Sequence, residues 1–150
     1  MLIVGSPAPD VVLTNQHEKV VDLATFRGER VLVFFYPKAS TPGCTQQACG
    51  LRDVAGSLEG TAIVGISPDK PAAQKKFDDK YALGYDLLAD TEHTVAESFG
   101  VWQEKVNYGK RYMGIVRSAF LISPQGVVEQ AWYKISPSDT PKKLLEAVGK

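Results

Sequence analysis

The chain has 150 residues, of which 44% are hydrophobic and 23% charged, a balance that fits one globular domain with a sizeable core. Lysine plus arginine equals aspartate plus glutamate at 17 each, so no charge excess points to nucleic acid or to an anionic membrane. The apolar run near residues 31–36 is far too short to cross a bilayer, and the opening MLIVGSPAPD has no basic leader, so we expect one cytoplasmic domain over residues 1–150.

Strand-like and helix-like segments alternate along the chain. The segments VVLTN (11–15) and KVVDL (19–23) flank QHE and predict a small N-terminal β-hairpin. The continuous apolar run VLVFFY (31–36) is typical of a strand that is covered on both faces. Further strands are predicted over TAIVGIS (61–67), DLLA (86–89), AFLIS (119–123) and VVEQAWY (127–133), the last two joined by a turn at PQG.

Helices are predicted between these strands, and two of them begin with the dipeptide Thr-Pro. The first begins at Thr41-Pro42 and the last at Thr140-Pro141, while Asp69 is expected to cap a third. The apolar residues that mark the helices are Cys44, Ala48, Leu51, Ala55 and Leu58; then Ala73, Phe77 and Tyr81; then Val95 and Phe99, before Gly100; and finally Leu144, Leu145 and Val148, before Gly149. The segment 103–116 is expected to be an excursion between elements.

This order of elements indicates an α/β fold. A strand–helix series that ends in a hairpin and a final helix predicts a central mixed β-sheet flanked by helices on both faces. That is the plan of a thioredoxin-like fold, although the pattern leaves the order of the strands open.

Both cysteines lie in the segment PKASTPGCTQQAC (37–49). If Thr41 is the N-cap, Cys44 is the third helical residue, beside unpaired backbone N–H groups at the positive end of the helix dipole, where a thiolate is stabilised. Gly43 leaves room for a small ligand to approach that backbone. The plainer alternative is a buried thiol on a core stripe behind an ordinary capped turn.

Cys49 follows Cys44 by five residues, about 140° around the same helix. In an intact helix the two Cα atoms would be about 9 Å apart, whereas a disulfide needs about 4.4–6.8 Å. The pair therefore cannot bond unless the helix unwinds, and Gly43 and Gly50 weaken the helix there. This arrangement fits a redox switch better than a structural staple; two unrelated core cysteines are the alternative.

The segment FFYPKASTPGCTQQACGLRD resembles the active-site segment of the peroxiredoxins. It is most similar to the bacterioferritin comigratory protein, or Q-type, group, whose pattern is Tyr-Pro-x-x-x-Thr-x-x-Cys. Pro37, Thr41 and Cys44 occupy the motif positions, and Arg117 in IVRSAFLI matches the family's active-site arginine. IVGISPDKP, FGVWQEK and YMGIVRS also match in order, so the resemblance covers essentially the whole chain. Gln47 stands where many members carry Glu, a difference that we expect the site to tolerate.

The resemblance implies an atypical two-cysteine peroxiredoxin that reduces hydrogen peroxide and organic hydroperoxides. Cys44 would be the peroxidatic residue, oxidised to a sulfenic acid, and Cys49 the resolving residue, which forms a disulfide with it in the same chain. Thioredoxin or a similar dithiol protein would then reduce that disulfide. No metal or organic cofactor is implied, and the resemblance favours a monomer.

Thiolate formation alone cannot make a good peroxidase, so other groups around the sulfur must assist. Arg117, the Thr41 hydroxyl and the backbone N–H groups of Gly43 and Cys44 would bind the peroxide and stabilise charge on the leaving oxygen. Pro37 would shape the pocket and shield the sulfur from water. Each residue also has a plainer role: Arg117 in a surface ion pair, Thr41 as a helix cap alone, and Pro37 as the end of a strand.

Two other functions remain open. A protein thiol–disulfide oxidoreductase shares the implied fold, but its usual Cys-x-x-Cys motif is absent. A redox-sensing module, in which disulfide formation melts a helix and changes a binding surface, is the non-enzymatic alternative.

Other candidate ligands are weaker. His17 and His93 lie in separate segments without flanking ligands, which argues against a zinc site. One basic side chain lies in sequence between two aromatic ones at Tyr108, Arg111 and Tyr112. We expect these to be loop residues near the rim of the pocket.

Overall fold

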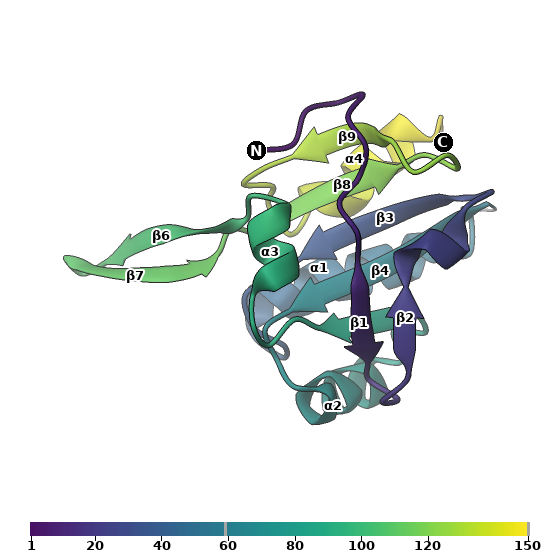
Figure 1. Cartoon of the computed structure of the whole chain (residues 1–150). Helices are drawn as coiled ribbons and strands as arrows, with labels where there is room; N and C mark the ends of the chain where they lie inside the picture. The colour runs from purple at the N-terminus through teal and green to yellow at the C-terminus, as the bar shows by residue number, and fades with distance from the viewer. Residues whose placement is uncertain (59, 150) are drawn as a thin grey trace.

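The computed structural model describes residues 1–58 and 60–149, and its strands form a seven-stranded sheet and a separate two-stranded ribbon (Figure 1). The order in the sheet is β2-β1-β5-β4-β3-β8-β9. These strands are β1 (Val12–Asn15), β2 (Val20–Asp22), β3 (Arg30–Phe35), β4 (Thr61–Ser67), β5 (Asp86–Ala89), β8 (Ser118–Ile122) and β9 (Val128–Trp132). The ribbon consists of β6 (Trp102–Asn107) and β7 (Lys110–Ile115).

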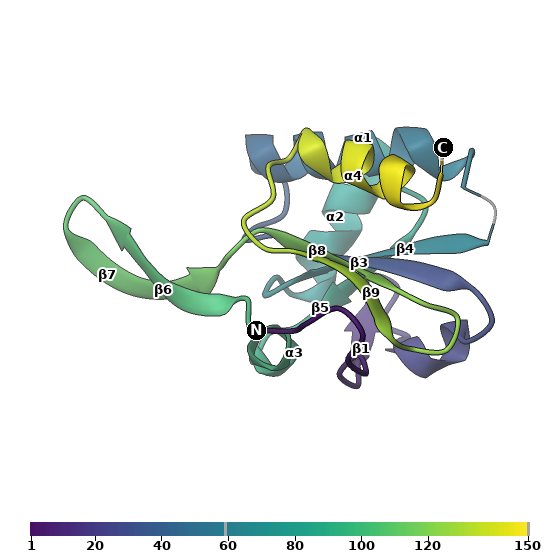
Figure 2. The same cartoon turned by 90° about the horizontal axis from the view of Figure 1, so that it is seen from above.

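Helices cover both faces of the sheet. Figure 2 shows α1 (Pro42–Ala55), α2 (Pro71–Tyr81) and α4 (Asp139–Ala147) on one side, and α3 (Thr94–Ser98) on the other. A 3₁₀ turn, η1 (Leu23–Phe26), follows β2. β3 pairs in parallel with β4, as does β4 with β5, whereas β8 pairs antiparallel with both β3 and β9. The sheet is therefore mixed, and the thioredoxin-like architecture and the N-terminal hairpin predicted from the sequence are confirmed.

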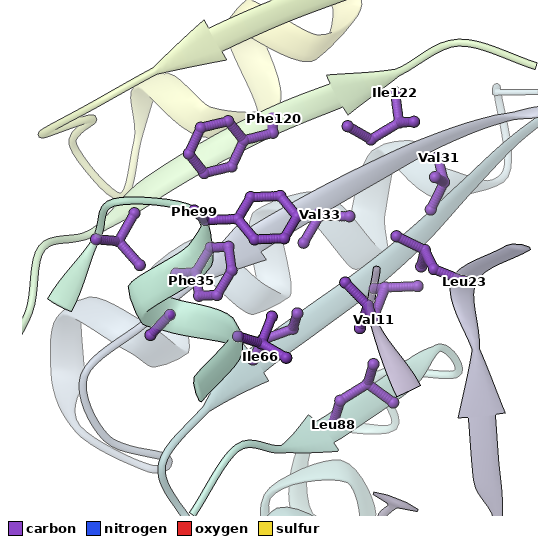
Figure 3. Close-up of a cluster of buried hydrophobic side chains, with 14 of the residues drawn as sticks. Val11, Leu23, Val31, Val33, Phe35, Ile66, Leu88, Phe99, Phe120 and Ile122 are labelled. Carbon is purple, nitrogen blue, oxygen red and sulfur yellow. The ribbon is translucent and has the colours of Figure 1, made fainter. Parts of the chain in front are cut away.

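β3 separates two apolar cores because its side chains alternate between the faces of the sheet. Val31, Val33 and Phe35 point to the same side as α3 and form the α3-side core with residues such as Phe120 (Figure 3). The intervening residues Leu32 and Phe34 belong to the α1-side core, defined by its packing against α1, α2 and α4. A continuous apolar run was the right signal for a strand buried on both faces.

Close packing on the α1 side requires a glycine in β4. A Cβ built on Gly65 would lie 2.8 Å from Cζ of Phe34 and 3.0 Å from Cδ2 of Leu87. The first distance is shorter than real carbon–carbon contacts and the second is unusually tight, so β4 packs this closely against the aromatic ring because residue 65 has no side chain.

Two predicted helix starts are wrong. The last helix begins at Asp139 after Ser138, two residues before the predicted Thr140-Pro141 start. Thr140 is fully buried, and its hydroxyl donates to the carbonyl of Ser136 at 2.9 Å, so it lies inside the first turn. Pro141 is tolerated there because the amides of a first turn have no intrahelical acceptor. Asp69 does not cap α2, whose N-cap is Lys70; its carboxylate binds elsewhere, as described below.

Two further expectations need correction. α1 ends at Ala55, before Leu58, although Leu58 is still buried in the α1-side core. The segment 103–116 forms most of the β6–β7 ribbon, so Arg111 and Tyr112 are strand residues rather than loop residues. The ribbon projects away from the sheet in both views, with Tyr108 at its turn almost completely exposed (Figures 1 and 2).

None of the helices in residues 1–58 and 60–149 has both the length and the apolar character needed to span a membrane.

Candidate active site

The loop of residues 37–41 connects the central strand β3 to α1 and begins the candidate site. Pro37 is half-buried and follows the buried Tyr36, one residue beyond the end of β3 at Phe35. Ser40 adopts a left-handed conformation with φ of 66°, which is uncommon for a residue with a side chain. Thr41 then takes the N-cap position, as predicted.

Thr41 caps α1 with its backbone rather than with its side chain. Its carbonyl accepts from the amide of Thr45 at 2.8 Å, the first intrahelical bond. Its hydroxyl donates to the carbonyl of Lys38 at 2.9 Å instead of accepting from a first-turn amide. Thr41 is therefore the N-cap, as predicted, but its side chain makes no capping hydrogen bond. The hydroxyl oxygen keeps its lone pairs for another donor.

Cys44 is the third residue of α1, also as predicted. The amides of Gly43 and Cys44 precede the first intrahelical bond, so they point along the helix axis without an intrahelical acceptor. The side chain is 1% exposed and packs in the α1-side core. The sulfur therefore lies at the positive end of the helix dipole and is covered from bulk solvent.

Arg117, between β7 and β8, is brought against this sulfur from 73 residues away. Its Nη1 and Nη2 atoms both lie 3.5 Å from Sγ of Cys44. Nη1 also donates to Oε1 of Gln47 at 2.8 Å. The guanidinium thus contacts the sulfur and a neutral amide, which does not fit the alternative of a surface ion pair.

Gln47 has a larger place in the site than its sequence suggested. It is fully buried, and its Nε2 donates to the hydroxyl of Thr140 at 2.9 Å. The amide therefore holds Arg117 on one side and α4 on the other. Its position one helical turn after Cys44 places it on the same face of α1, which was a usable signal. Its contact with Thr140, 93 residues away, had no signal in the sequence.

Gly43 lies directly beneath the guanidinium. A Cβ built on Gly43 would be 3.1 Å from Nη2 of Arg117 and 3.6 Å from Cγ of Pro137. The absence of a side chain at this position lets Arg117 approach the start of α1 closely.

Cys49 is held apart from Cys44 in this structure. Both residues carry free thiols within the unbroken helix α1, and Cys49 is half-buried at the edge of the α1-side core. Residues on either side of Cys49 are hydrogen-bonded to neighbouring segments. The Tyr85 hydroxyl donates to the carbonyl of Ala48 at 2.8 Å, and Arg52 donates to the carbonyl of Tyr81 at 2.6 Å. Burial raises the pKa of Tyr85 well above its ordinary value, which keeps this hydroxyl a donor.

A cavity of about 490 Å³ lies beside Arg117, between the ribbon and the sheet. Lys105 and Tyr112 line it from the ribbon, with Val116, Lys134 and Ile135 on the other walls. Burial, reinforced by the positive charge of Arg117, lowers the pKa of Lys105. The cavity therefore adjoins the arginine, and its lining carries both basic side chains and the carboxylate of Glu104. No cysteine lines it.

The described residues contain no cluster of three or more His, Cys, Asp or Glu side chains that could hold a metal ion. His93 instead stacks on Trp102 at the base of the ribbon, with ring centroids 3.7 Å apart.

Comparisons with known proteins show to which family the chain belongs. Residues 4–131 match the model of the AhpC/TSA family. The chain is 48% identical over 147 residues to a putative peroxiredoxin bcp of Haemophilus influenzae, covering 97% of this chain and 95% of that protein. It is 41% identical over 147 residues to peroxiredoxin Bcp of Bacillus subtilis, covering 97% and 94% of the two chains. The chain belongs to the AhpC/TSA family.

Solved structures agree. A mutant of Xanthomonas campestris peroxiredoxin Q superposes with a TM-score of 0.88 at 32% identity, covering 93% of this chain and 90% of that one. The peroxidoxin BcpB of Mycobacterium tuberculosis gives a TM-score of 0.88 at 32% identity and covers 99% and 97% of the two chains. The resemblance to bacterioferritin comigratory, or Q-type, peroxiredoxins is confirmed, and these homologues support a thiol peroxidase activity.

Proposed function

We propose that the chain is a peroxidase that uses Cys44 to reduce hydrogen peroxide and organic hydroperoxides, and Cys49 to resolve the product as an intramolecular disulfide. The observation that carries the proposal is the pairing of Arg117 with the Cys44 sulfur at the start of α1, with two nitrogens at 3.5 Å. A guanidinium next to a thiol at the start of a helix stabilises the thiolate, and its N–H groups also stabilise the negative charge that develops on a departing oxygen.

In the first step, the Cys44 thiolate attacks one oxygen of the peroxide and the O–O bond breaks. The sulfur becomes a sulfenic acid, and the other oxygen leaves as hydroxide or alkoxide, which takes up a proton to give water or an alcohol. Arg117 and the amides of Gly43 and Cys44 are the donors for the oxygen that gains charge. The Thr41 hydroxyl, whose proton is already directed to Lys38, is suited to accept a hydrogen bond from the peroxide.

The second step requires α1 to open. The Cα atoms of Cys44 and Cys49 are separated by about 9 Å in a regular helix, beyond the range of about 4.4–6.8 Å for a disulfide. Opening breaks the Gln47 bonds to Arg117 and Thr140. The Cys49 sulfur then attacks the sulfenic sulfur, the S–S bond forms and water leaves.

Recycling requires a dithiol. Thioredoxin or a similar protein would reduce the Cys44–Cys49 disulfide through a mixed disulfide, which restores both thiols. Opening of α1 supports this step because it would expose sulfurs that are buried or half-buried in the wound helix.

The test is thiol counting on the reduced chain after one equivalent of hydrogen peroxide. Wild type is expected to lose both thiols within one chain. Cys49→Ser is expected to stop at a sulfenic acid that a sulfenate-specific reagent traps, and Cys44→Ser is expected not to react rapidly. A wild-type chain that keeps both thiols would refute the proposal.

A coupled assay separates this function from its rivals. Peroxide-dependent, repeated consumption of thioredoxin thiols supports a peroxidase. Reduction of a protein disulfide in the absence of peroxide would instead indicate a thiol–disulfide oxidoreductase. A single turnover without recycling by any dithiol protein would indicate a redox-sensing module.

A further inference from the structure

The backbone of the loop 37–41 is hydrogen-bonded to the carboxylate of Asp69. Oδ2 of Asp69 accepts from the backbone amide of Ala39, the middle residue of the loop, at 2.7 Å. Asp69 follows β4, 30 residues away along the chain. A hydrogen bond from an amide to a carboxylate is charge-assisted and stronger than one between neutral groups.

A buried polar network holds that carboxylate in place. The Ser67 hydroxyl donates to the same Oδ2 at 2.7 Å and accepts from Nε2 of Gln74 at 2.9 Å. Gln74 also donates to the carbonyl of Leu88 at 3.1 Å and accepts from the Tyr36 hydroxyl, which lies next to Pro37 in the chain. Tyr36, Ser67 and Gln74 are all fully buried, so the network joins the residue that follows β3 to β4 and α2.

The loop needs such an anchor. Ser40 holds a left-handed backbone conformation, with φ of 66°, which persists only where surrounding contacts impose it. The hydroxyl of Thr41 turns back onto Lys38 within the same loop. The bond from Ala39 to Asp69 links this locally strained segment to the rigid sheet.

The anchor is also independent of the part of α1 that must open. Asp69 and its network lie outside residues 42–49, whereas the Gln47 bonds to Arg117 and Thr140 lie inside. Unwinding the first turns of α1 breaks the Gln47 bonds and leaves the Asp69 bond intact.

We infer that Asp69 is a positioning residue of this site, which keeps Pro37 and Thr41 in place around Cys44 and fixes the loop while α1 opens and closes. The inference rests on the proposed function of Cys44. It assigns to Asp69 an effect on peroxide attack that acts through the loop, without contact between Asp69 and the peroxide.

The experiment measures attack and resolution separately in the full chain. Attack is followed as sulfenate trapping in a Cys49→Ser background with hydrogen peroxide, and resolution as disulfide formation in chains that retain Cys49. Asp69→Ala is expected to slow attack by about tenfold to a hundredfold, the range that small misplacements of catalytic groups produce. The resolution rate is expected to change by less than about threefold, because the anchor lies outside the opening segment.

Two variants separate positioning from charge and from general destabilisation. Asp69→Asn removes the charge but keeps an oxygen acceptor, and is expected to restore attack to within about threefold of wild type. Asp90→Ala is the matched control, because Asp90 is a 2%-exposed carboxylate that accepts from the amides of Val95 and Ala96 at the start of α3. It is expected to lower the melting temperature and leave the attack rate unchanged.

Two results would overturn the inference: wild-type attack by folded Asp69→Ala, or equally slow attack by the Asn and Ala variants. If Asp69→Ala does not fold, amide exchange in wild type decides, because Ala39 is expected to exchange far more slowly than a free amide. Free-amide exchange at Ala39 would overturn the inference as well. A wild-type chain whose Cys44 does not react with peroxide refutes the proposed function instead, before any variant is compared.

Discussion

The side chains buried on the two faces of the sheet differ in chemical type. The α3-side core consists of aliphatic and phenylalanine side chains; in it Phe35, Phe99 and Phe120 pack ring against ring. The α1-side core contains Cys44, and buried polar side chains such as Gln47 and Gln74 lie on the same face. Every buried side-chain nitrogen and oxygen in the described residues has a hydrogen-bond partner.

This difference separates the face that stabilises the fold from the face that carries the candidate active site. Apolar packing has no alternative partners, so one face can stabilise the fold without taking part in the reaction. Hydrogen bonds between buried side chains are directional and can be broken and remade, which suits a helix that holds Arg117 against Cys44 and, in the proposed mechanism, later opens. The comparison predicts that substitutions on the α3 side change stability alone, whereas those that touch Arg117 or Cys44 on the α1 side change rates.

The largest effect is expected from Phe120→Ala. Phe120 is fully buried, with ring centroids 5.1 Å from Phe99 and 5.2 Å from Tyr133. Removing its ring should cost about 3–5 kcal/mol of unfolding free energy, measured by urea denaturation. The attack rate per folded molecule should stay at the wild-type value. A folded variant that attacks peroxide much more slowly would show that the two faces are coupled.

Gln47→Leu should have a smaller effect on stability and a clear one on rate. The variant deprives Arg117 of the Oε1 acceptor at 2.8 Å, so the guanidinium is no longer fixed beside Cys44. We expect attack to slow about tenfold, equivalent to about 1.4 kcal/mol in the barrier, in the sulfenate-trapping assay.

Thr140→Val is the matched control for Gln47→Leu. It removes the hydroxyl that accepts from Gln47 at 2.9 Å but leaves the bond between Gln47 and Arg117 in place. It should lower the unfolding free energy by about 1–3 kcal/mol and change attack by less than about threefold. Equal losses of rate in both variants would mean that the contact with α4, rather than the hold on Arg117, controls attack.

The strands of the seven-stranded sheet could be predicted well from the sequence, because burial on both faces leaves continuous apolar runs such as residues 31–36, whereas the exposed β6–β7 ribbon leaves no such run and was missed. The helix start at Thr41-Pro42 was also predicted, since its signal is local. The same local signal failed at Thr140-Pro141, where a buried contact with Gln47 places Thr140 inside α4. Local sequence does not reveal partners that tertiary packing supplies.

The site shows the same limit. The place of Cys44 at the start of a helix followed from neighbouring residues, whereas Arg117 came only from the family motif and meets the sulfur through the strand order. Asp69 was predicted to cap α2 because of its neighbours, but it binds Ala39 across the site. Hydrogen bonds over long sequence separations carry no periodicity, so pattern analysis could not find them.

The smallest changes in rate, and the most specific in position, are expected from a pair of glycine substitutions in α1. Gly43→Ala and Gly50→Ala each place a Cβ 3.1 Å from a neighbour: Nη2 of Arg117 in the first case and Cγ of Pro141 in the second. Only the first neighbour touches the Cys44 sulfur, so Gly43→Ala should slow attack about threefold, or about 0.7 kcal/mol, by displacing the guanidinium. Gly50→Ala should leave attack unchanged.

Gly50→Ala should instead act on resolution. An alanine inside the helix stabilises the wound state by up to about 1 kcal/mol over glycine where the Pro141 ring shifts to admit its Cβ, so disulfide formation should slow by up to about fivefold. Both rates come from the same trapping and disulfide assays, and the two variants should give opposite patterns. If both slow attack equally, crowding anywhere along α1 is sufficient, and the chemistry is not confined to the few atoms between Gly43, Cys44 and Arg117.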